Sequence, residues 1–188
     1  TNMIPFFEIS LSKKSIDAAV CALQNEKLVL GESVFKFEEE FSKYIGTKYA
    51  VSTNSGNSAL HLSLIALGLQ KKHKIATSTN SFIASANCIK MIDAKPILCD
   101  IYSNDGSINI NSHKEKPDAI IPVHIYGNPC KFDEIQSYSN DNKIPIIEDA
   151  AQAHGAIYKN KKVGSLGDVG CFSFYTTKNM TVGGDGGM

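Results

Sequence analysis

Apolar residues in the first part of the chain recur every three or four positions, which is the spacing of an amphipathic helix. One stripe follows Ser12, whose hydroxyl is suited to cap a helix, and a second runs over residues 33–44 and stops at Gly46. The same spacing predicts further helices directly before Gly68 and over residues 81–91 and 132–140.

Two short runs, residues 119–123 and 144–149, are apolar at nearly every position. Strands with this composition are usually buried on both faces of a parallel sheet. Further extended segments are predicted at residues 49–52, 74–77 and 96–100. Because strands alternate with helices, the pattern predicts an α/β layered fold with right-handed crossovers, in which the polar stretch 103–116 is a surface excursion.

In sheets of this kind, ligands bind beyond the carboxyl ends of the strands. That rule selects three stretches of this chain, residues 53–58, 149–154 and 173–178. We expect them to converge on one site.

Composition limits the classes of partner that the protein is expected to bind. Its 188 residues suffice for one domain, and 19 Lys plus Arg balance 19 Asp plus Glu, so the charge indicates neither nucleic acid nor an anionic membrane. The five cysteines are scattered without metal-ligand spacing, which predicts reduced, mostly buried thiols. Without a visible signal peptide or an apolar run of membrane-spanning length, we expect a cytoplasmic protein.

Three groups of residues are candidates for ligand binding or catalysis, and each also has an ordinary structural explanation. Gly56 and Asn57 lie where a strand end meets a helix start, which suits a phosphate or simply a capped turn. Asp149 ends a buried strand, where a carboxylate needs a cationic partner or caps the next helix. Lys178 stands among aromatic and small residues, so it is either a buried nucleophilic amine or a loop lysine.

The order of these groups, together with six short stretches, resembles the DegT/DnrJ/EryC1/StrS family of sugar aminotransferases from about Pro5 to Met188. The stretches are SGNSAL at 55–60, NSFIASAN at 80–87, IPVHIYG at 121–127, IEDAAQAHG at 147–155, VGSLGD at 163–168 and CFSFYTTKN at 171–179. Such a family is identified by motifs in sequence order, and all six stand in the expected order.

The resemblance implies the large domain of a fold-type I enzyme that depends on pyridoxal 5'-phosphate (PLP). This domain is a three-layer α/β/α sandwich with a mostly parallel central sheet. Residues 1–188 would be the N-terminal, PLP-binding portion of a longer chain, truncated before a small C-terminal domain, as the glycine cluster before Met188 also leads us to expect. The resemblance further implies a homodimer with a shared active site.

The same resemblance implies a role for each matching residue. Lys178 would form the Schiff base with PLP and then carry the proton as acid and base. Asp149 would keep the pyridine nitrogen protonated, Gln152 would form a hydrogen bond with the phenolic oxygen, and Phe82 would stack on the ring.

Gly56, Asn57 and Ser173 would hold the cofactor phosphate. Asn57 departs from the threonine usual in the family, although its backbone N–H can still bind phosphate. His124 and His154 also match the family pattern, and we expect both to be buried, hydrogen-bonded structural residues.

The implied reaction moves an amino group from an amino acid, by analogy L-glutamate, to a keto-sugar nucleotide. Two alternatives stay open. The first is a sugar dehydratase of the same family that depends on pyridoxamine phosphate (PMP); such relatives carry histidine where this chain has Lys178, which argues against that reading. A sugar-sensing regulatory protein without turnover would have little use for Lys178, Asp149 and Gln152 together.

Overall fold

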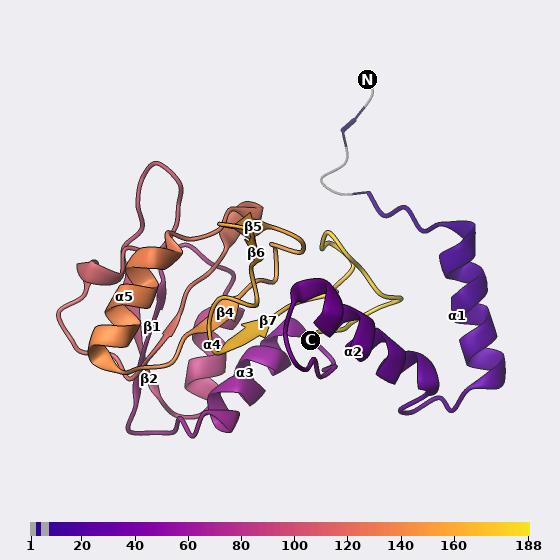
Figure 1. Ribbon diagram of the computed structural model, residues 1–188, viewed down its shortest axis with the longest axis horizontal. Helices are drawn as coiled ribbons and strands as arrows, with labels where there is room; N and C mark the ends of the chain where they lie inside the picture. Colours follow the sequence, from indigo (N-terminus) through magenta and orange to yellow (C-terminus); the bar gives the residue numbers. More distant parts are fainter. Residues whose placement is uncertain (1–2, 5–7) are drawn as a thin grey trace.

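A parallel sheet forms the centre of the protein (Figure 1), whose computed structural model describes residues 3–4 and 8–188. Its strands are β1 (Lys74–Ser78), β2 (Lys95–Cys99), β3 (Ala119–Ile121), β4 (Ile147–Asp149) and β7 (Val169–Cys171). β1 pairs in parallel with β2 and β3, and β4 with β7. Parallel bridges from Ile120 to Ile146 and from Val123 to Asp149 join the two groups, which gives the order β2-β1-β3-β4-β7.

Helices cover both faces of this sheet. Helices α3 (Gly56–Ala66) and α4 (Ala84–Met91) share one apolar core cluster with Ile75 of β1. Helix α5 (Phe132–Asn142) shares the opposite cluster with Ala76, the next residue of the same strand. Because successive strand residues point to opposite faces, the two clusters lie on the two sides of the sheet. The predicted three-layer α/β/α fold is confirmed.

The two N-terminal helices confirm the predicted caps but differ in how they pack. In α1 (Lys13–Asn25), the Ser12 hydroxyl accepts a hydrogen bond from the Ser15 N–H, and no residue of the helix is buried. Helix α2 (Glu32–Ile45) ends at Gly46, whose φ of 93° suits glycine. Phe41 of α2 is buried against aromatic residues near the C-terminus, whereas α1 lies farthest from the sheet (Figure 1).

Residues 49–52 do not form the strand that the sequence predicts. The next residue, Thr53, makes an antiparallel bridge to Gly187, and Gly187 makes a second antiparallel bridge to Ser173. Strand structure requires a paired neighbour, and within residues 3–4 and 8–188 no strand pairs with residues 49–52. The last residues of the chain therefore lie between Thr53 and the extension of β7.

Several smaller features differ from the sequence expectations. The short antiparallel pair β5 (Ile157–Tyr158) and β6 (Lys161–Lys162), and the 3-10 turns η1 (Ile110–Ser112) and η2 (Ile125–Gly127), were not predicted. The polar stretch 103–116 is only partly a surface excursion, because its two isoleucines, Ile108 and Ile110, are buried in the α5 cluster. Pro5, where the family resemblance begins, lies outside the described residues.

Candidate functional site

The three predicted ligand-binding stretches converge on one cavity of about 360 Å³ at the carboxyl ends of β4 and β7. Its lining includes every residue for which the resemblance implies a cofactor contact: Gly56, Asn57, Phe82, Asp149, Gln152, Ser173 and Lys178. A cavity that gathers an amine, a carboxylate and a helix N-terminus is the best candidate site in the described structure.

The N-terminus of α3 forms one wall of the cavity. Ser55 caps this helix by accepting a hydrogen bond from the Ser58 N–H at 3.1 Å. The N–H groups of Gly56 and Asn57 lie in the first turn, where a helix has no carbonyl to pair with them and where its dipole favours an anion. These groups fit a phosphate.

Gly56 brings this helix end against Ser173 from the loop after β7. A Cβ atom at position 56 would lie 2.8 Å from the Ser173 Cβ atom, which is too close for two carbon atoms. Glycine is therefore needed for Ser173 to reach the same end of the cavity as the α3 N–H groups. The two predicted phosphate-binding segments are in direct contact.

Asn57 has a buried side-chain oxygen without a hydrogen-bond partner in the described structure, while its amide nitrogen contacts the Met91 sulfur at 3.5 Å. Turning the amide over would exchange the two atoms, so that an N–H donor would replace the unpaired oxygen. An orphaned polar atom beside the α3 N-terminus fits a site that receives an anion there.

Asp149 is buried at the end of β4, with 5% of its surface exposed. Its carboxylate accepts hydrogen bonds from the Ser85 hydroxyl at 2.6 Å and the Ala151 N–H at 3.2 Å. Burial raises the pKa of this carboxyl, although Ser85 and the nearby Lys178 charge lower it. A cation bound against Asp149 would restore its charged form, so the residue fits the protonated nitrogen of a pyridine ring.

Gln152 has a defined orientation because its side-chain oxygen accepts a hydrogen bond from the Tyr126 N–H at 2.9 Å. With the oxygen occupied, the NH2 group is the part of the side chain left to donate into the cavity. The arrangement fits a ligand oxygen that carries negative charge.

Lys178 and Phe82 line the cavity from its outer side. Phe82 is 69% exposed, so its ring is available to be covered by a planar ligand. Lys178 is half-buried, and its backbone N–H donates to the Tyr175 carbonyl at 2.8 Å. The lysine thus enters the cavity from a turn directly after the Ser173 segment.

The two histidines differ from each other. His124 is fully buried and hydrogen-bonded, as predicted. The ring nitrogens of His154 are buried, as predicted, but neither meets the geometry of a hydrogen bond with a partner in the part of the chain that is described. Burial lowers the pKa of His154 to about 4, so the ring is neutral near pH 7 and packs against Phe172 and Phe174.

The cysteines offer no competing nucleophile at the site. Four of them are buried, as predicted, and Cys21 is exposed. Burial raises the pKa of Cys88 and of Cys171 to about 12, so both thiols stay protonated at neutral pH. Among residues 3–4 and 8–188, no group of three His, Cys, Asp or Glu side chains is placed to hold a metal ion.

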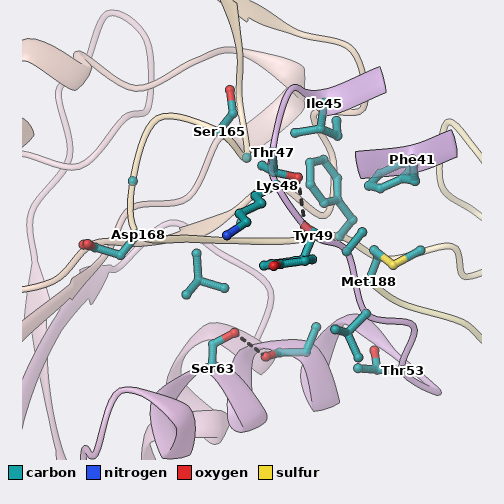
Figure 2. Close-up of a pocket in the computed structure, with 18 of the residues that line it drawn as sticks. Phe41, Ile45, Thr47, Lys48, Tyr49, Thr53, Ser63, Ser165, Asp168 and Met188 are labelled. Carbon is teal, nitrogen blue, oxygen red and sulfur yellow. Dashed lines mark hydrogen bonds between the residues drawn. The ribbon is translucent and has the colours of Figure 1, made fainter. Parts of the chain in front are cut away.

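A larger cavity of about 630 Å³ lies elsewhere, between α2 and α3 (Figure 2). Phe41 and Ile45 of α2 face Ser63 of α3 across it, and Met188 reaches its edge. None of the candidate residues lines this space. Because chemistry requires converging reactive groups rather than volume, the smaller cavity remains the candidate site.

Sequence reasoning missed the partners that orient the predicted residues. Ser85 belongs to one of the family-like stretches, but only the structure shows that it holds Asp149. The Tyr126 N–H that orients Gln152 is a backbone group, for which no side-chain signal exists. Asp185 also lines the cavity, and its position among the C-terminal glycines gave no indication of this.

A parallel sheet covered on both faces, with a lysine, a carboxylate and a helix N-terminus at its carboxyl edge, is the arrangement of fold-type I PLP enzymes. The model of the DegT/DnrJ/EryC1/StrS aminotransferase family matches residues 10–188, and the chain belongs to this family.

Individual relatives agree with this assignment. The GDP-perosamine synthase of Caulobacter vibrioides is 38% identical over 85% of this chain and 44% of its own length. The structure of DesV from Streptomyces venezuelae, in complex with a ketimine intermediate, has a TM-score of 0.88 at 32% identity, covering 93% of this chain and 48% of DesV. A Streptococcus pneumoniae structure described as a PLP form has a TM-score of 0.92 at 27% identity, covering 98% and 52%.

The chain spans about half the length of the curated relatives it matches. No described helix is both long enough and apolar enough to cross a membrane.

Proposed function

We propose that the protein is a PLP-dependent aminotransferase that transfers an amino group to a keto-sugar nucleotide. The observation that carries the proposal is the convergence of Lys178, Asp149 and the α3 N-terminus on one cavity. Relatives named GDP-perosamine synthase and transaminase of UDP- and dTDP-linked sugars support the substrate class. When bound, PLP supplies an electron sink that stabilises negative charge on the substrate carbon.

Each residue then has a defined task. Lys178 would hold the cofactor covalently through its amine, a condensation that releases water, and would then move a proton to and from the substrate carbon. Asp149 keeps the ring nitrogen protonated, because a buried carboxylate is stabilised by an adjacent cation. Gln152 donates its NH2 group to the phenolic oxygen, and Phe82 covers one face of the ring.

The phosphate end of the cofactor is held separately from the reacting end. Gly56 and Asn57 donate backbone N–H groups from the first turn of α3, and Ser173 adds its hydroxyl. The contact between Gly56 and Ser173 supports this assignment, since it fixes the spacing of the donors. Anchoring the phosphate sets the distance from the ring to Lys178 and Asp149.

The amino donor, the assembly and the chain organisation belong to the same proposal. L-Glutamate is the expected donor, and the expected assembly is a cytoplasmic homodimer with a shared active site. We further propose that residues 1–188 form the N-terminal, PLP-binding portion of the large domain. The half-length matches to the relatives and the solved structures support that organisation.

Product analysis tests the proposal. The protein is incubated with PLP, L-glutamate and a 4-keto-6-deoxy sugar nucleotide, and the products are separated by mass spectrometry. An amino sugar that gains the glutamate nitrogen, shown with 15N-labelled glutamate, is the expected result. A deoxygenated sugar without nitrogen would indicate a dehydratase, and unchanged sugar in a protein that binds it without PLP would indicate a sensor.

A further inference from the structure

Glu148 is a buried acid to which the proposed reaction gives no task. It precedes Asp149 in β4, and its side chain is completely buried. Because neighbouring strand residues point to opposite faces, Glu148 points away from the cavity that Asp149 lines. A buried carboxylate without partners would cost several kcal/mol of stability, so its surroundings must offset that cost.

The Glu148 carboxylate accepts four hydrogen bonds. One oxygen accepts from the N–H groups of Leu166 and Gly167, at 2.7 and 2.8 Å. The other accepts from the Gly164 N–H at 2.7 Å and from His124 Nε2 at 3.0 Å. Each of the two oxygens therefore has two N–H partners, so the hydrogen-bonding positions of the carboxylate are occupied.

The His124 ring has a single compatible tautomer. Its Nδ1 atom accepts a hydrogen bond from the Cys130 N–H at 3.1 Å, so the ring proton lies on Nε2 and is donated to Glu148. The backbone N–H of His124 donates to the Asp149 carbonyl at 3.0 Å. His124 is therefore held from both its side chain and its main chain.

The turn that follows His124 controls Gln152. Tyr126 adopts a φ of 58°, a left-handed conformation that is unfavourable for an aromatic residue and persists only when its surroundings enforce it. In this conformation its N–H meets the Gln152 oxygen. The connection therefore runs from Glu148 to the His124 side chain, along the backbone of residues 124–126, and from the Tyr126 N–H to Gln152.

We propose that Glu148 is a positioning residue, which acts through His124 and the 124–126 turn to aim the Gln152 NH2 group at the cofactor. The inference rests on the proposed function, because Gln152 needs a defined direction only if a ligand oxygen is to be bound. The three bonds to Gly164, Leu166 and Gly167 fix the loop before β7, and the bond to His124 carries the positioning effect.

The test compares Glu148→Gln with Asp168→Asn in the full chain. Glu148→Gln preserves size but places an NH2 group against N–H donors. Asp168 lies at the end of the same loop and accepts the Ile146 N–H at 2.8 Å, but it does not contact His124, so its variant is the matched control. Glu148→Gln should weaken PLP binding about tenfold and shift the pH at which the visible band of the lysine-bound cofactor changes. Asp168→Asn should lower the Tm and leave both quantities unchanged.

A second variant keeps the test decisive if Glu148→Gln does not fold. His124→Leu retains the three loop bonds of Glu148 and removes the link to the turn, so it should reproduce the weaker PLP binding and the spectral shift. If folded His124→Leu titrates and binds PLP like the wild type, the positioning role is wrong.

Two measurements distinguish a failure of this inference from a failure of the proposed function. In the cofactor-free protein, the amides of Gly164, Leu166 and Gly167 should exchange with solvent faster in Glu148→Gln than in the wild type. A wild-type protein that never develops the visible band would contradict both the proposed function and this inference. A wild type with the band, beside variants that match it in affinity and titration, would overturn the inference alone.

Discussion

At the scale of single residues, the close contact between Gly56 and Ser173 constrains the geometry of the site. Gly56→Ala introduces a Cβ atom 2.8 Å from the Ser173 Cβ atom, so α3 and the Ser173 segment must move apart. Because both segments would donate to the phosphate in the proposed site, we expect PLP to bind about tenfold more weakly or worse. Gly183→Ala is the control, since an added Cβ atom there meets nothing within 4 Å. Equal PLP affinity of the two variants, measured by fluorescence titration, would contradict the phosphate assignment.

Gln152 makes a second prediction at this scale. Gln152→Glu keeps an oxygen that accepts from the Tyr126 N–H, but it replaces the NH2 donor by an acceptor. An oxygen of the new carboxylate would then face the phenolic oxygen of the cofactor. We therefore expect at least about tenfold weaker PLP binding and a displaced visible band. Spectrophotometric titration of variant and wild type measures both. An unchanged affinity and band position would show that Gln152 does not donate to the cofactor.

Asp149 makes the stability of the cofactor-free protein depend on pH. Burial raises its pKa above the ordinary 3.8, so the folded protein holds this proton more tightly than the unfolded chain does. The stabilisation that this proton gives is complete below the pKa of Asp149 in the unfolded chain. It is lost as the pH rises through the higher pKa of the folded protein. Asp149→Asn should remove this slope and be more stable at neutral pH by about 1 kcal/mol, while binding PLP far more weakly. Urea unfolding from about pH 4 to about pH 8 checks the sign, and an unaltered slope in the variant contradicts it.

At the scale of elements, α1 and α2 should contribute very differently to stability. Phe41 of α2 packs edge-to-face on Phe172 and Phe174, with ring centroids 5.0 and 5.4 Å apart. Phe41→Ala should cost about 3–5 kcal/mol because it leaves a cavity. Val20→Ser in α1, whose side chain is 46% exposed, should cost less than about 0.5 kcal/mol. Urea unfolding of the two variants measures the contrast, and comparable losses would contradict the described packing of α1.

Elements with a local signal could be predicted from the sequence. The apolar run 119–123 contains β3, and the run 144–149 contains β4, because a strand covered on both faces has no polar side. Ser12 and Gly46 marked a helix start and a helix end through local hydrogen bonds and backbone conformation. Residues 49–52 have the composition of a strand, but strand structure depends on a neighbour that no local pattern reveals.

The site likewise combines features that a local sequence signal predicts with features that depend on distant parts of the chain. The positions of Lys178, Asp149 and Gly56 at one sheet edge could be predicted, because strand ends of a parallel sheet meet there. The orienting contacts of Ser85 and of the Tyr126 N–H depend on tertiary distances, so no sequence pattern revealed them. His154 shows a different limit, since a buried histidine was expected to be hydrogen-bonded, whereas its ring packs on two phenylalanines without a hydrogen-bond partner among the described residues.

At the scale of the whole molecule, the candidate site and the larger cavity occupy different parts of the protein. The smaller one gathers the candidate residues where the strands end, and the larger one lies between α2 and α3 beside Met188. The sheet, with helices on both faces, keeps β4 and β7 in register, so that Asp149 and the Lys178 segment hold a fixed relation. The fold therefore contributes to the proposed chemistry by rigid placement.

Covalent binding of PLP by Lys178, in the cavity that Asp149 also lines, can be followed by absorption spectroscopy. The wild-type protein mixed with PLP should turn yellow, bleach on addition of L-glutamate, and carry PLP on Lys178 after borohydride reduction and peptide mapping. Lys178→Ala should show none of these changes, and Lys131→Ala, which alters a lysine outside the cavity, should show all of them. A Lys178→Ala protein that keeps the visible band and the bleaching would contradict the account.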